Sequence, residues 1–237
     1  MSALDDLLAV QALDLSADQL SHRRANLPER AELNSCQADL LALETRSAGV
    51  EALRNEVARN EKRLEDEISM VRDKSAHTEK TLYSGSINVP RELTALQEEI
   101  EALARRQRQL EDQELELMEQ AEPLDADLAS MAAERTKLDD HAIGLLARIA
   151  EEETVIDAEL GNVQARRATA VQAVPADLLD EYERLRRALG GIGIARLSGN
   201  RCEGCHLTLS AVDVDRIRHE PPDTLVHCTE CSRMLVP

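Results

Sequence analysis

One stretch of the sequence decides the fold: residues 96–145 read LQEEIEALARRQRQLEDQELELMEQAEPLDADLASMAAERTKLDDHAIGL. Every seventh residue in it is apolar, which gives eight consecutive positions: Leu96, Leu103, Leu110, Leu117, Leu124, Met131, Leu138 and Leu145. A second apolar stripe, offset by four residues, includes Ile100, Ala121, Leu128, Ala142, Ile149, Ile156 and Val163. A repeat of seven predicts a helix that supercoils against another helix.

An earlier segment carries a matching stripe, formed by Cys36, Leu43, Val50, Val57, Leu64 and Val71. The turn-forming residues 83–90 separate the two segments, and Asn88 is the expected N-cap of the second one. Because residues 3–82 and 91–173 are nearly equal in length, we expect an antiparallel hairpin with its tip at about 83–90. Pro28 and Pro123 are expected to kink its arms. An intermolecular coiled coil is the alternative, and a homodimer through the remaining apolar faces is compatible with either arrangement.

The composition of the 237 residues agrees with long helices rather than a compact enzyme core. The chain has no Trp, no Phe and two Tyr, whereas large cores bury aromatic side chains. The net charge of −18 lies entirely in residues 1–180, because residues 181–237 hold eight acidic and eight basic side chains. This charge argues against a chain that binds phosphate backbones along its whole length.

The cysteines call for an explanation other than disulfides. The sequence shows neither a secretory signal nor an apolar run of the roughly 20 residues that span a bilayer. We therefore expect a cytoplasmic protein without a membrane partner, in a compartment where disulfides are rare.

Four of the five cysteines form a metal-binding pattern. Cys202 and Cys205 make one Cys-x-x-Cys pair, and Cys228 and Cys231 make a second pair after 22 intervening residues. Two such pairs supply four thiolates, which suit one structural Zn²⁺ ion in a zinc ribbon with short strands. The alternatives are an iron–sulfur cluster, a redox dithiol, c-type haem attachment at the first pair, or a ligand role for His206 or His227. The remaining cysteine, Cys36, lies in the apolar stripe and is expected to be a small core residue.

These patterns predict a mostly α fold: a long antiparallel coiled-coil helical hairpin followed by a small β-rich zinc ribbon. The expected domains are the hairpin at 1–174, a short helix and Gly-rich connector at 175–197, and the ribbon at 198–237. A hairpin returns the chain to its starting end, so the short helix and the ribbon should lie beside the N-terminus.

The sequence resembles a family of bacterial proteins that combine an N-terminal coiled-coil hairpin with a C4-type zinc ribbon. The resemblance is concentrated in residues 88–100, in 182–186 with the Gly-rich 190–195, and in 228–235. Two positions depart from the family pattern: Ser232 stands where Gly is usual, and Val236 where an aromatic residue is frequent. The resemblance implies an adaptor or chaperone-like role, with partners such as an alternative sigma factor or components of flagellar and type III export. For one member, the resemblance also implies binding of messenger RNA.

We therefore expect a non-enzymatic protein that binds protein partners through its coiled coil. The sequence shows no P-loop, dinucleotide fingerprint or Ser/His/Asp arrangement, so we name no catalytic residue. One alternative is a nucleic-acid (RNA) binding regulator that uses a basic cluster next to the ribbon: Arg184, Arg186, Arg187, Arg196 and Arg201. The other is an RNA polymerase-binding coiled-coil regulator, although residues 84–88 at the tip lack the carboxylates that such a role requires.

Overall fold

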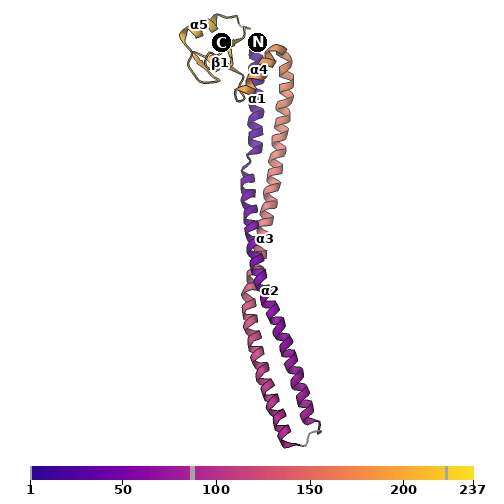
Figure 1. Ribbon diagram of the computed structural model, residues 1–237. Coiled ribbons are helices and arrows are strands. Elements are labelled where there is room, and N and C mark those ends of the chain that lie inside the picture. Colours follow the sequence, from indigo (N-terminus) through magenta and orange to yellow (C-terminus); the bar gives the residue numbers. More distant parts are fainter. Residues whose placement is uncertain (1, 86–88, 222–223) are drawn as a thin grey trace. The chain divides into compact units, whose positions relative to one another are not determined.

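Three long helices account for most of the protein. A computed structural model describes residues 2–85, 89–221 and 224–237. Helix α1 spans Ala3–Ala25, α2 spans Pro28–Tyr83 and α3 spans Pro90–Ala170 (Figure 1). The long helices of the predicted hairpin are therefore confirmed. The expected N-cap, Asn88, lies outside the described residues.

The first arm is broken at Pro28 rather than kinked, so that part of the prediction was wrong. Helix α1 ends at Ala25, where the Asn26 amide donates to the carbonyls of His22 and Arg23. Helix α2 then begins at Pro28, a position where the missing N–H and fixed φ of proline suit a helix start. Pro123 lies inside α3, which continues through it.

Residues Leu33–Gly144 form one compact unit, in which α2 packs antiparallel to α3. Ion pairs between the two helices show the direction, since partners further along α2 lie earlier in α3. The pairs are Arg54 with Asp125 at 2.9 Å, Arg72 with Glu111 at 2.6 Å and Lys74 with Glu99 at 2.9 Å.

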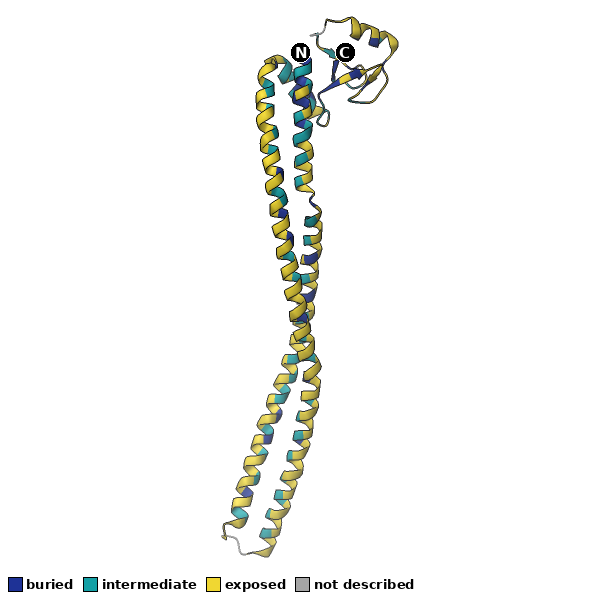
Figure 2. Ribbon diagram, turned by 180° about the vertical axis from the view of Figure 1, so that it is seen from behind, coloured by how far each residue is buried: buried dark blue, intermediate teal, exposed yellow. Residues whose placement is uncertain are grey.

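Within this unit, the predicted stripes of seven form the seam. Leu43, Leu64, Leu110 and Met131 are all buried, and the other members are buried or half-buried. Figure 2 shows buried and half-buried positions along the sides of the helices that face each other. Cys36 is also buried here, and its thiol donates to the carbonyl of Leu138 at 3.3 Å. The period of the sequence therefore predicted the packed face correctly.

The second compact unit contains Met1–Glu32 and Leu145–Pro237. Its largest apolar cluster joins α1 to the C-terminal region, with Leu7 and Val10 packed beside Tyr182 and Met234. A short 3-10 helix, Val171–Ala173, leads from α3 to α4, which spans Ala176–Ala188. These contacts confirm that the short helix and the ribbon lie beside the N-terminal helix. The predicted three-domain division of the chain remains a prediction.

A four-stranded sheet with the order β2-β1-β4-β3 forms the ribbon. The strands are β1 (Ile194–Ser198), β2 (Arg201–Cys202), β3 (Val226–His227) and β4 (Met234–Val236). Strand β1 pairs parallel with β4 and antiparallel with β2, and β3 pairs antiparallel with β4. A helix absent from the sequence prediction, α5 (Ala211–His219), lies between the two cysteine pairs and is capped by Ser210.

Candidate metal centre

Each Cys-x-x-Cys pair sits in a tight turn at the end of a short strand. In the first turn, the His206 amide donates to the Cys202 carbonyl at 2.8 Å, and in the second the Ser232 amide donates to the Cys228 carbonyl at 2.9 Å. Both turns end in the left-handed backbone region, with φ of 62° at His206 and 63° at Ser232. The two turns are therefore equivalent, and each aims its two thiols at the same point.

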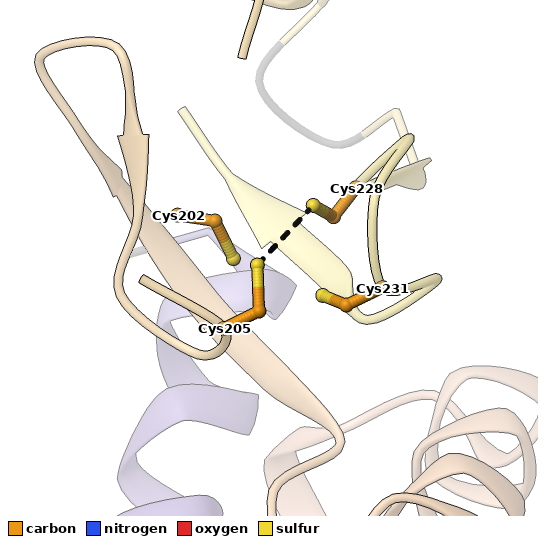
Figure 3. Close-up of side chains that lie close together, drawn as sticks. All are labelled: Cys202, Cys205, Cys228 and Cys231. Carbon is orange, nitrogen blue, oxygen red and sulfur yellow. Dashed lines mark hydrogen bonds between the residues drawn. The ribbon is translucent and has the colours of Figure 1, made fainter. Parts of the chain in front are cut away.

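The structure brings all four predicted cysteines together. The sulfurs of Cys202, Cys205, Cys228 and Cys231 lie within 4.8 Å of one another, and they converge from two separate segments (Figure 3). Sulfurs of Cys205 and Cys228 are 3.9 Å apart. A tetrahedral ion with Zn–S bonds of about 2.3 Å separates its sulfurs by about 3.8 Å. The donor set and its spacing therefore fit one structural zinc ion.

Burial and hydrogen bonding act differently on the thiols. Burial raises the pKa of Cys202, and it raises the pKa of Cys228 to about 12. Burial also opposes ionisation of Cys231, but the backbone and side chain of Arg233 and the thiols of Cys205 and Cys228 donate to it and lower its pKa to about 7. A divalent cation favours the thiolate form at all four positions, so metal binding and proton release are coupled.

Arg233 fixes the second turn to the rest of the unit. Its Nε donates to the Ile192 carbonyl at 3.0 Å, and its Nη2 donates to the Leu189 carbonyl at 2.8 Å. Its side chain also covers the first turn, because a Cβ added to Gly204 would lie 2.6 Å from the Cδ atom of Arg233. One arginine therefore contacts both cysteine turns and the connector after α4.

The two histidines beside the cysteines lie outside this cluster. His206 is exposed, and the Nε2 atom of His227 lies 3.6 Å from a carboxylate oxygen of Glu181. Among the described residues, the only group of three or more His, Cys, Asp or Glu side chains close enough to share an ion is the four-cysteine cluster.

The five arginines of the proposed nucleic-acid surface all have acceptors within the chain. Three of them donate to carboxylates: Arg184 to Glu181 at 2.9 Å, Arg186 to Asp18 at 2.8 Å and Arg196 to Asp5 at 3.0 Å. The other two donate to carbonyls: Arg187 to Glu183 at 3.1 Å and Arg201 to His206 at 2.9 Å. Their role in nucleic-acid binding remains a prediction.

Two polar residues of α1 hold the Gly-rich connector and α4 in place, and their roles were not predicted from the sequence. The Gln11 amide bridges the Gly-rich connector, donating to the Gly191 carbonyl at 2.9 Å and accepting from the Gly193 amide at 2.8 Å. Asp14 is 3 % exposed and accepts from Tyr182. Both lie on the same face of α1 as Leu4, Leu7 and Val10. A polar residue within an apolar stripe is the sequence feature that could have indicated their buried contacts.

Comparison with known proteins agrees with this architecture. Residues 10–190 match the model of the CT398-like coiled coil hairpin domain, and residues 201–235 match that of the C4-type zinc ribbon domain. The chain belongs to the CT398-like family. The family ribbon and the four converging sulfurs together support one structural zinc ion in this CT398-like protein.

Relatives cover nearly the whole length of this CT398-like chain. The uncharacterized protein Rv2229c of Mycobacterium tuberculosis is 32% identical, over 97% of this chain and 93% of that protein. A solved structure from Mycobacterium smegmatis is similar with a TM-score of 0.90 and 26% identity, covering 99% of this chain and 97% of that one. The structure of CT398 from Chlamydia trachomatis shares the fold, with a TM-score of 0.72, 24% identity and the same coverage of both chains.

Long helices raise the question of a membrane span. Across residues 2–85, 89–221 and 224–237, no helix combines the length and the apolar character that crossing a bilayer requires.

Proposed function

We propose that the protein is a non-enzymatic adaptor with a chaperone-like role, in which the paired helices bind protein partners and zinc stabilises the ribbon. The observation that carries this proposal is a set of large apolar side chains that are exposed on the long helices rather than buried in the seam. Their exposed fractions are 67% at Leu41, 72% at Met70, 57% at Leu115, 52% at Met118 and 64% at Ile143. Apolar groups on an otherwise charged helix surface are typical anchors for a protein partner.

The metal centre supports a structural role. A catalytic zinc usually has three protein ligands and one open position for water or substrate. Here four cysteine sulfurs surround one point, with Cys202 and Cys228 buried and Cys205 and Cys231 half-buried. Four thiolates fill the coordination of the ion, so the zinc holds the ribbon as a rigid recognition element.

The partner classes we propose are components of the transcription or secretion machinery, as the family resemblance implies. The test is affinity capture of the full-length, tagged protein from its native cell, followed by mass spectrometry. We expect a small set of proteins that untagged protein displaces. Recovery of nothing above the level of the untagged control, from cells that express the tagged chain, would overturn the adaptor role.

Nucleic-acid binding through the ribbon is the second candidate. Residues 184–201 carry five arginines and no acidic residue, which favours contact with phosphates. Three of the guanidinium groups already contact carboxylates, so we rank this function below protein binding. A gel shift with the full-length protein at low salt tests this candidate. RNA that is retarded by the wild type but not by Arg187→Gln would support it. RNA that the wild type does not retard would rule it out.

A further inference from the structure

A groove runs along one side of the seam in the unit Leu33–Gly144. It has a volume of about 530 Å³ and is lined by α2 residues between 37 and 51 and α3 residues between 128 and 139. Leu43 and Met131 are buried beneath it, whereas Leu41 on its edge is 67% exposed. We call this surface the Leu41 groove.

The residues at the seam explain why the groove is open. A well-packed pair of helices fills each seam position with a large apolar side chain. Here Ser47 stands one turn after Leu43 on α2, and Arg135 stands one turn after Met131 on α3. Leu40, Leu41 and Leu128 line the groove beside these two polar seam positions, and Leu41 is exposed. The groove therefore has an apolar floor along the line where a third helix packs onto a helix pair.

The charge around the groove is acidic. Glu44 and Glu51 line it, and within the described part of the chain neither forms an ion pair, whereas its one basic residue, Arg135, lies 3.7 Å from Asp139. The whole unit holds 25 acidic and 14 basic residues, and residues 111–130 contain eight acidic and no basic ones. A second copy of this unit would bring like charges together, which is unfavourable at an interface.

We propose that the Leu41 groove binds one amphipathic helix of a partner protein, with an apolar face in the groove and Lys or Arg on both flanks. The proposal rests on the proposed adaptor function and names the surface and the chemistry of the partner. The lining spans residues 37–51, or about 21 Å of helix, so the partner contributes about four turns. Contacts to Leu41 and Leu128 supply the apolar anchor, and Glu44 and Glu51 select a basic partner.

The probe is a fluorescent 16-residue peptide with leucines on one helical face and lysines on the flanks, titrated against the full-length protein. One control peptide carries glutamate at every lysine position, and another has the same composition in an order that is not amphipathic. Of the three peptides, we expect only the basic amphipathic one to bind. Leu41→Gln should weaken it about tenfold, the loss expected when one large apolar anchor is removed. Glu44→Gln with Glu51→Gln should weaken binding about threefold and reduce its dependence on salt.

Matched variants exist on the same helices. Leu53→Gln removes an apolar group that is 55% exposed but lies outside the groove, and it should change binding less than twofold. Glu92→Gln with Glu98→Gln removes the same charge from exposed positions near the tip and should also have little effect.

Three results would overturn the groove proposal: no binding of the basic peptide, equal binding of the reordered peptide, or equal losses of peptide affinity in Leu41→Gln and Leu53→Gln. The adaptor function has its own readout. If captured partners bind wild type and Leu41→Gln equally, the groove proposal fails and the adaptor function stands. If wild type captures no partner, the adaptor function fails whatever the peptide does.

Discussion

The hydroxyl of Tyr182 donates a hydrogen bond of 2.7 Å to Oδ2 of Asp14, and both side chains are buried. Asp14 lies on α1 and Tyr182 on α4, 168 residues later. Arg167 of α3 donates to Oδ1 of the same carboxylate, and Arg186 has its Nε 3.7 Å from Oδ2. A buried carboxylate is stable only when such partners compensate its charge, so Asp14 makes three helices depend on one another.

Removing the carboxylate should cost more than removing the hydroxyl. Asp14→Ala leaves the Tyr182 hydroxyl unpaired and leaves Arg167 with Glu183 as its remaining carboxylate partner, and it should lower the free energy of unfolding by about 2–3 kcal/mol. Tyr182→Phe removes one neutral donor and should cost about 1–2 kcal/mol. Urea unfolding followed by circular dichroism measures both, with the exposed Glu98→Ala as a control that should stay close to wild type. Equal stability of Asp14→Ala and Glu98→Ala would contradict the role of this network.

The same contact predicts how stability changes at alkaline pH. Burial and the hydrogen bond to Asp14 raise the pKa of Tyr182 well above its usual value of about 10. The unfolded chain therefore loses this proton first, so the contribution is complete below pH 10 and falls above it, by at most about 1.4 kcal/mol per pH unit. The difference in unfolding free energy between wild type and Tyr182→Phe should shrink from pH 9 to pH 11. A constant difference would show that the hydroxyl does not titrate as the contact requires.

The sequence predicted those features that depend on local spacing. A repeat of seven fixes which side of a helix is apolar, and the structure buries Leu43, Leu64 and Leu110 on that side. The spacing of the two Cys-x-x-Cys pairs fixed which sulfurs meet, because each pair forms its own turn.

Features that depend on distant contacts were not predictable in this way. The partners of Gln11 lie about 180 residues away, and a glutamine on a helix gives no indication of which amide it will meet. Helix α5 had a local signal, since Ser210 caps it and also contacts Asp213 three residues later, but a short helix between two metal turns has little apolar periodicity.

Gly193 should not tolerate a side chain. A Cβ at this position would lie 2.8 Å from the backbone carbonyl oxygen of Tyr182, an atom that cannot move without shifting α4. Gly193→Ala should therefore lower the free energy of unfolding by about 2 kcal/mol. Gly49 in α2 is the matched control, because a Cβ there meets no atom within 4 Å. Gly49→Ala should raise stability by about 0.5–1 kcal/mol through helix propensity, and opposite signs for the two variants in urea unfolding are the expected outcome.

Zinc content should separate the two kinds of cysteine. Cys228→Ser removes one of four ligands, so metal analysis should fall from about one zinc per chain toward none. The helical signal should remain, because the ligands lie outside the long helices. Cys36→Ala should leave the zinc content unchanged, since its thiol contacts the Leu138 carbonyl on the neighbouring helix. Zinc lost equally from both variants would show that the ligand set has been misassigned.

The second cysteine turn carries strain that a single substitution can remove. Ser232 has φ of 63°, a region in which a side chain costs about 1 kcal/mol and glycine costs nothing. The family resemblance places Gly at this position, and the observed backbone supplies the physical reason. Ser232→Gly should therefore stabilise the ribbon by about 0.5–1 kcal/mol, after the greater freedom of glycine in the unfolded chain is subtracted.

The readout is the concentration of a chelator that removes half of the zinc, which should rise in Ser232→Gly. Ser198→Gly is the matched control, because Ser198 is an exposed strand residue whose φ lies outside the left-handed region. Glycine in a strand loses more conformational freedom on folding, so this control should release zinc more readily than wild type. A decrease in zinc retention for both variants would mean that the Ser232 side chain contributes contacts worth more than the strain it imposes.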